Sequence, residues 1–164
     1  MTLEPIWTKD LDIVFVGINP RSESVENGMY FHENNSFWSQ LNESEITSEI
    51  TDSKNMLKYN IGIDNLVHRP TKSSKELSKK EYYDGRKELE QKILEQKPKT
   101  VCFLGKKAFR KYFKEKPENH GWQKEKILES KVFIAYVPKK NKYDSKMNIT
   151  EKDKINKLKE LKSQ

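Results

Sequence analysis

The chain has 164 residues, of which 34% are hydrophobic and 35% charged, and its formal net charge is +7. This length suits a single domain, residues 1–164, and no run approaches the roughly 20 apolar residues that a membrane-spanning helix needs. One cysteine and three widely spaced histidines exclude an internal disulfide and a recognisable zinc site. We therefore expect a soluble, intracellular protein of the cytoplasm that needs no metal ion.

The N-terminal half predicts two buried strands with a long loop between them. Residues 12–17 form an apolar, β-branched run that ends in Gly, which is typical of a strand buried on both faces of a sheet. An irregular loop follows to about residue 34, then short helices over 36–42 and about 51–59, and a second strand over 62–67. Long ordered loops after buried strands often carry functional residues, so we expect a site there.

The C-terminal half predicts strands that alternate with helices. Residues 78–97 place apolar side chains at helical spacing, and Ser78 and Glu81 form a capping box at the start. Residues 100–104 predict a third buried strand that leads through Gly into an amphipathic helix, and a turn precedes a strand over 132–137.

Positive charge is concentrated at the C-terminal end, where a helix is predicted near residues 150–162. Residues 139–164 hold nine Lys against four acidic residues, which is +5 of the total +7. Lys side chains that neutralise phosphates release counterions, so this surplus favours nucleic acid as a partner. A well-solvated surface explains the same composition, and charge alone does not decide between the two interpretations.

The alternation of strands and helices predicts an α/β fold, a three-layer sandwich with a central, mostly parallel sheet of four to five strands flanked by helices. In such sheets, ligands bind beyond the carboxyl ends of the strands, where the strand order switches. The loops after Gly17, Leu66 and Val137 are therefore the candidates for a site.

The loop after the first strand holds the parts of a base-binding pocket. Asn19 with Pro20 is by itself a turn signal, and Tyr30 and Phe31 could be core residues. Together they place an amide and an aromatic pair at the carboxyl end of a buried strand. A stacking face and a hydrogen-bonding amide are what an enzyme needs to hold a base flipped out of DNA.

Several motifs carry a family resemblance. They are residues 17–20 (GINP), Phe31 with Asn35 and Phe37-Trp38, residues 62–71 (GIDNLVHRPT), 77–81 (LSKKE), 103–108 (FLGKKA) and 121–123 (GWQ). In order and spacing over roughly residues 12–138, they resemble the mismatch-specific uracil/thymine DNA glycosylases of the uracil-DNA glycosylase superfamily. The resemblance implies the fold of that superfamily. It also implies a monofunctional enzyme that flips out uracil, including uracil opposite guanine, and hydrolyses its bond to the sugar. Such an enzyme leaves an abasic site for base-excision repair.

The resemblance also implies a role for each matching residue. Asn19 would be catalytic and would orient the attacking water, since an amide is too weak a base to deprotonate it. Phe31 would stack on the flipped base and Asn65 would hydrogen-bond its edge. The full base-binding set would be Gly17, Ile18, Tyr30, Phe31 and Asn65. No Lys lies in the first motif to act as a nucleophile, so the reaction would be simple hydrolysis without a cofactor.

Two departures from the family pattern concern the contact with DNA. Arg21 stands where the family has Gly, which puts a long cation near the pocket. The family's last motif, Asn-Pro-Ser followed by small residues and an Arg, is replaced by residues 137–142 (VPKKNK), of which only the Pro matches. We predict DNA contacts from Arg21, Lys139, Lys140, Asn141 and Lys142. The lysines would hold phosphates and Lys140 or Asn141 would probe the gap left by the base, although a solvated basic loop is an alternative.

The predicted partner is uracil-containing DNA, double-stranded or single-stranded. We expect the protein to bind it as a monomer and not to associate with a membrane. Loss of the last motif would favour single strands, from which no base must be flipped. A second hypothesis is a catalytically weak or inactive glycosylase-fold protein that binds DNA. A third, a nucleotide-binding α/β module, is disfavoured because the chain has no GxGxxG or GxxxxGK[ST] pattern.

Overall fold

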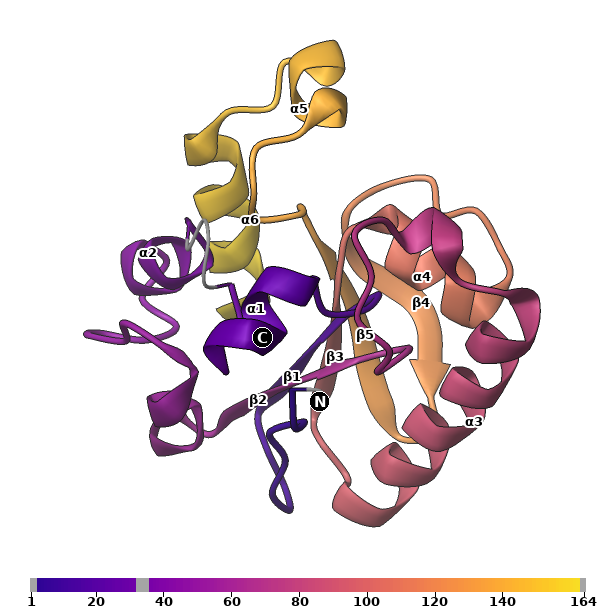
Figure 1. Ribbon diagram of the computed structural model, residues 1–164. Helices are drawn as coiled ribbons and strands as arrows, with labels where there is room; N and C mark the ends of the chain where they lie inside the picture. Colours follow the sequence, from indigo (N-terminus) through magenta and orange to yellow (C-terminus); the bar gives the residue numbers. More distant parts are fainter. Residues whose placement is uncertain (1–2, 32–35, 163–164) are drawn as a thin grey trace.

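A five-stranded sheet forms the centre of the molecule (Figure 1). The computed structural model describes residues 3–31 and 36–162. The strands are β1 Ile13–Gly17, β2 Ile61–Asn65, β3 Thr100–Leu104, β4 Gly121–Ile127 and β5 Ser130–Ala135. They lie in the order β2-β1-β3-β5-β4, and every neighbouring pair is parallel except β5 and β4. This confirms the predicted α/β fold with a mostly parallel sheet.

Helices cover both faces of the sheet. They are α1 Ser22–Asn27, α2 Ser36–Glu43, η1 Ser53–Tyr59, η2 Ser74–Glu76, α3 Lys79–Gln96, α4 Lys106–Phe113, α5 Lys142–Met147 and α6 Glu151–Lys162. Ile13 and Phe15 of β1 belong to a core shared with α1, α2 and α6, whereas the alternate residues Val14 and Val16 belong to a core shared with α3 and α4 (Figure 1). A strand with both faces buried therefore sits between two helical layers. Across the described residues, no helix is long and apolar enough to cross a membrane.

The segment after β1 is more ordered than predicted. Where the sequence predicted an irregular loop, residues Ser22–Asn27 form α1, which ends at Gly28 in the left-handed region with φ of 66°. Val25 is the apolar residue that this helix buries. A six-residue helix with one such residue is too short to show helical periodicity, so the pattern could not reveal it.

The edge strand β4 is a second difference from the sequence analysis, which predicted no strand over residues 121–127. Only the two ends of β4, Gly121 and Ile127, are buried, so the strand carries no apolar run. It pairs with β5 as an antiparallel hairpin. β5 itself ends at Ala135, two residues before the predicted end, and leaves Val137 42% exposed.

The capping box predicted at the start of the long charged helix is confirmed. The Ser78 hydroxyl accepts a hydrogen bond from the backbone N–H of Glu81 at 3.1 Å, and the Glu81 carboxylate accepts one from the N–H of Ser78 at 3.0 Å. A similar box, which the sequence analysis did not predict, joins Asn141 and Asp144 at the start of α5. These caps satisfy backbone donors that the first turn leaves without a helical partner.

Candidate active site

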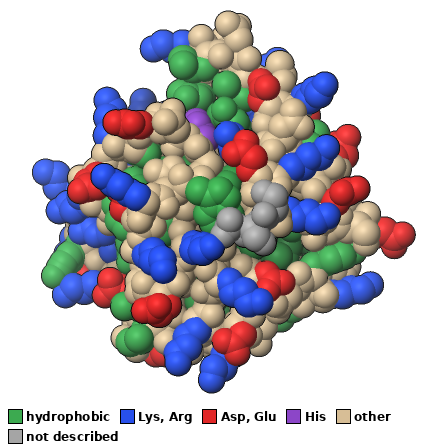
Figure 2. Space-filling model, turned by 180° about the vertical axis from the view of Figure 1, so that it is seen from behind, with side chains coloured by type: hydrophobic (Ala, Val, Ile, Leu, Met, Phe, Trp, Pro, Cys, Tyr) green, Lys and Arg blue, Asp and Glu red, His purple; other side chains and the backbone are tan. Residues whose placement is uncertain are grey.

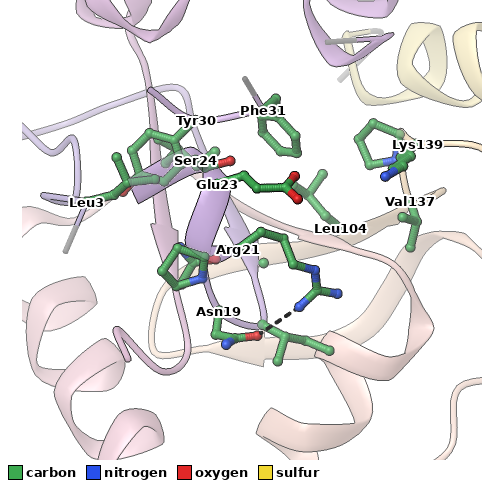
Figure 3. Close-up of a pocket in the computed structure, with 16 residues that line it drawn as sticks. Leu3, Asn19, Arg21, Glu23, Ser24, Tyr30, Phe31, Leu104, Val137 and Lys139 are labelled. Atoms are coloured by element: carbon green, nitrogen blue, oxygen red, sulfur yellow. Dashed lines mark hydrogen bonds between the residues drawn. The ribbon is translucent and has the colours of Figure 1, made fainter. Parts of the chain in front are cut away.

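A pocket of about 270 Å³ lies at the carboxyl ends of the parallel strands (Figure 3). The residues that line it are Leu3, Gly17, Ile18, Asn19, Pro20, Arg21, Glu23, Ser24, Tyr30, Phe31, Ile63, Asn65, Leu104, Val137, Pro138 and Lys139. Apart from Leu3 of the N-terminal segment, they come from β1, β2 and β3, from the segment after β1 that includes α1, and from the loop after β5. This is the edge at which an α/β sheet of this kind binds ligands. The volume suits one small ring better than a large cofactor.

Most of the residues singled out in the sequence meet in this pocket. Those that line it are Gly17, Ile18, Asn19, Arg21, Tyr30, Phe31, Asn65 and Lys139. Lys140, Asn141 and Lys142 do not line it, and the Asn141 side chain is engaged as the N-cap of α5, accepting from the N–H of Asp144 at 3.1 Å. Asn35 lies outside the described residues.

The Asn19 side chain is held in one orientation. Its amide nitrogen donates to the backbone oxygen of Arg69 at 3.0 Å and to Oγ1 of Thr71 at 2.7 Å. The Thr71 hydroxyl in turn donates to the backbone oxygen of Ser73 at 2.8 Å, so it must accept from Asn19. Because both acceptors require an N–H donor, they fix which end of the amide carries the nitrogen. The Asn19 carbonyl oxygen is thereby left on the pocket side.

Two charged side chains, Arg21 and Glu23, also line the pocket, and neither was assigned to catalysis in the sequence analysis. Nη1 of Arg21 donates to Oδ1 of Asn19 over a long distance of 3.4 Å, and Figure 3 shows Glu23 reaching into the pocket from α1. A guanidinium donates to carbonyl oxygens of a base, and a carboxylate accepts from its N–H groups. The pocket thus offers both kinds of hydrogen-bonding group to a nucleobase.

Phe31 supplies a supported aromatic face. Its ring packs on Phe37 with centroids 4.6 Å apart and lies edge-on to Trp38 at 5.9 Å. Its backbone φ is +56°, in the left-handed region that β-carbon-bearing residues rarely occupy. Such strain is concentrated at functional sites, where the surrounding structure enforces it. Helix α2 therefore holds the Phe31 ring against the pocket.

Tyr30 offers its ring rather than its hydroxyl. It is 7% exposed, and its hydroxyl donates to the backbone oxygen of Glu4 at 2.9 Å. Burial, with smaller contributions from Asp64 and Glu4, raises the pKa of the Tyr30 phenol well above its usual value. The hydroxyl therefore stays protonated and tied to the N-terminal segment, and it is no candidate for a general base.

The amide of Asn65 reaches the pocket because its neighbour in the sheet is a glycine. Gly17 pairs with Asn65 across β1 and β2, and a β-carbon at Gly17 would lie 2.8 Å from Oδ1 of Asn65. The backbone N–H of Asn65 donates to Oδ1 of Asp64 at 2.7 Å. Asp64 is buried and also accepts from Trp7 and pairs with His68, each at 2.8 Å. Asp64 thus ties the N-terminal segment and the loop after β2 to the strand end that carries Asn65.

The contact between His68 and Asp64 predicts a pH dependence of stability. Hydrogen bonding to Asp64 raises the pKa of His68 above its usual value of 6.5. The folded protein then holds this proton more tightly, so the contribution is full below about pH 6.5 and is lost as the pH rises through the raised pKa. His68 is 36% exposed, so we expect less than about 1 kcal/mol. Urea unfolding at about pH 6 and about pH 9 should show this loss in the wild type, and the His68→Gln variant should show a smaller one.

A group of cations lies beside the pocket. Nζ of Lys107 donates to the Ser74 hydroxyl at 2.7 Å. Burial lowers the pKa of Lys107, and the nearby charges of Lys111, Arg110, Arg21 and Lys75 lower it further. These cations come from α4, η2 and the loop after β1, so only the fold brings them together. Their shared field attracts an anionic ligand to this edge of the sheet.

The loop after β5 is held by a buried lysine. Lys154 of α6 is 3% exposed, and its Nζ donates to the backbone oxygens of Val137 at 2.8 Å and Pro138 at 3.2 Å. It also pairs with the buried carboxylate of Asp144 at 2.7 Å. Gln40 of α2 donates to the same Pro138 oxygen at 3.1 Å. This wall of the pocket is therefore fixed by α2, α5 and α6 together.

The described residues include no group of three or more His, Cys, Asp and Glu side chains arranged to hold a metal ion.

In the comparison with known families, the model described as "Uracil DNA glycosylase superfamily" matches residues 5–160. The match spans all five strands and every residue that lines the pocket except Leu3.

Proposed function

Because the chain belongs to the uracil DNA glycosylase superfamily, we propose that it is a monofunctional glycosylase that excises uracil from DNA, including uracil opposite guanine. The family indicates a DNA glycosylase of base-excision repair, and the choice of base and mismatch is the proposal. The motifs around GINP and GIDNLVHRPT support placing it beside the mismatch-specific uracil/thymine enzymes.

The observation that carries the proposal is the fixed carbonyl of Asn19 beside the supported ring of Phe31. With its nitrogen committed to Arg69 and Thr71, Asn19 presents an acceptor on the pocket side. That acceptor can hold a water by one hydrogen, with the water oxygen directed at the sugar carbon of a base stacked on Phe31. Positioning, rather than deprotonation, is the contribution expected from an amide.

The proposed reaction is a hydrolytic displacement. The water oxygen forms a bond to C1′ of the sugar while the bond from C1′ to the base nitrogen breaks, and the electron pair leaves with the base. The water loses one proton to solvent, and the base anion gains one on release. Asn65 and Arg21 would donate to carbonyl oxygens of the departing base and so stabilise its negative charge. An abasic site remains.

Purified protein should produce alkali-sensitive abasic sites in oligonucleotides that contain uracil. We expect cleavage with U·G duplex and with single-stranded uracil, and none with the same sequences carrying cytosine. The measurement is the cut fraction on a denaturing gel against time, at single turnover. Absence of cutting on U·G, U·A and single-stranded uracil alike would rule the proposed activity out.

The second candidate is a protein that binds DNA without excising a base. The hydrogen bond from Arg21 favours it, since the guanidinium shares the carbonyl oxygen that a water would need. In the same assay, this candidate requires salt-dependent DNA binding without abasic sites. Appearance of cutting in Arg21→Gly alone would identify Arg21 as the cause.

A further inference from the structure

Exposed apolar side chains are concentrated next to the pocket, in residues 137–147, which we name the α5 segment. Val137 is 42% exposed, Tyr143 40% and Met147 51%. Figure 1 shows α5 projecting beyond the end of the sheet, and Figure 2 shows hydrophobic side chains at that end of the molecule with Lys and Arg around them. Apolar surface exposed in this way marks an interaction site when it is contiguous and rimmed by polar groups.

The exposure of these side chains is not the result of a loose loop. Asn141 and Asp144 cap α5 reciprocally, each with a hydrogen bond of 3.1 Å. Asp144 is in turn paired with the buried Nζ of Lys154, which also holds the backbone at Val137. The α5 segment is therefore a rigid platform whose apolar side chains are presented to solvent.

An aromatic stack lies beside Tyr143. The ring of His120 is stacked on Tyr136 with centroids 3.9 Å apart, and the Tyr143 ring lies 6.1 Å from His120. Burial lowers the pKa of His120 to about 4, so this ring is uncharged at neutral pH. Tyr143 is thus placed at the outer end of a series of three rings, with its own face still accessible.

The exposed charge on the α5 segment has one sign. Lys139, Lys140, Lys142 and Lys146 are all exposed, whereas its single carboxylate, Asp144, is buried and paired. Cations beside an aromatic face complement a nucleic-acid strand, because phosphates take the cations and base faces stack on the ring. The segment is continuous with the pocket, since Val137, Pro138 and Lys139 belong to both.

We propose that the α5 segment binds the DNA strand beside the nucleotide in the pocket, with Tyr143 stacked on a neighbouring base and the lysines on the flanking phosphates. The inference rests on the proposed function only in requiring DNA to reach the pocket. It differs from the sequence-based prediction for Asn141, whose side-chain oxygen accepts from the N–H of Asp144 and whose nitrogen donates to the backbone oxygen of Lys139.

The test measures binding to a G-containing duplex with a stable abasic-site analogue, so that no excision is needed. A fluorescent adenine analogue beside the lesion reports unstacking of the neighbouring base. Tyr143→Ala should weaken binding about 5- to 150-fold, the range for loss of one aromatic–base stack, and should reduce the fluorescence change. Tyr143→Phe should retain both. Lys142→Gln should lower the slope of log affinity against log salt by about one, a slope that Tyr143→Ala leaves unchanged.

Tyr83→Ala is the matched control, because Tyr83 is 42% exposed on the outer face of α3. Equal affinity of Tyr143→Ala and Tyr83→Ala for the lesion duplex would overturn the proposal. So would an effect of Tyr143→Ala confined to self-association or to binding of anionic vesicles. A protein that excises nothing yet shows the Tyr143 effect on binding would separate this inference from the proposed activity.

Discussion

The Asn19→Ala variant will bind uracil-containing DNA as the wild type does but excise uracil about 10²- to 10³-fold more slowly, the range for loss of one preorganised catalytic hydrogen bond. Truncation removes the carbonyl that would hold the water, while the stacking ring of Phe31 and the nearby cations remain. The rate of abasic-site formation at saturating enzyme gives the chemical step, and fluorescence anisotropy gives the affinity.

The matched control for this prediction is Asn27→Ala, which removes an exposed asparagine of α1 whose amide donates to the backbone oxygen of Glu23. It should change neither rate nor affinity. A rate for Asn19→Ala within about threefold of wild type would show that water is positioned by another group. Loss of binding in parallel with rate would instead assign Asn19 to base affinity.

The Lys154→Met variant will lose about 3–5 kcal/mol of the free energy of unfolding, the usual effect of removing one partner of a buried ion pair. Methionine fills a similar volume but leaves the Asp144 carboxylate buried without its cation. It also removes the Lys154 donor from the backbone oxygen of Val137 and one of the two donors, Lys154 and Gln40, from that of Pro138. Proteins typically have a free energy of unfolding of about 5–15 kcal/mol, so the expected loss is a large fraction of the total. Urea unfolding of the variant and the wild type measures the loss.

Lys157→Met on the same helix is the control. Lys157 pairs with Glu160 at 3.0 Å near the surface, where Glu160 is 52% exposed. Lys157→Met should therefore lose less than about 1 kcal/mol of the free energy of unfolding. The double variant Lys154→Met with Asp144→Leu should recover part of the stability, because no unpaired charge then stays buried. Equal losses for Lys154→Met and Lys157→Met would contradict the prediction.

The sequence predicted the parallel strands because residues buried on both faces form continuous apolar runs, as at residues 100–104. It did not reveal β4, since an edge strand needs few apolar residues, or α1, which is too short to show a period. In the pocket, GINP pointed to Asn19, but its partners Arg69 and Thr71 lie 50 or more residues away and are set by the pairing of β1 with β2. Lys154 carries no signal, because in a Lys-rich helix a buried lysine has the same local pattern as its solvated neighbours.

Lys154 holds the loop after β5 through main-chain oxygens, which every residue type provides. The course of that loop is therefore largely independent of its side chains. This explains how residues 137–142, which share only Pro138 with the family's last motif, can still form a wall of the pocket. Positions 139, 140 and 142 can therefore change their side chains while the pocket wall stays in place, whereas Asn141 is constrained because its side chain caps α5.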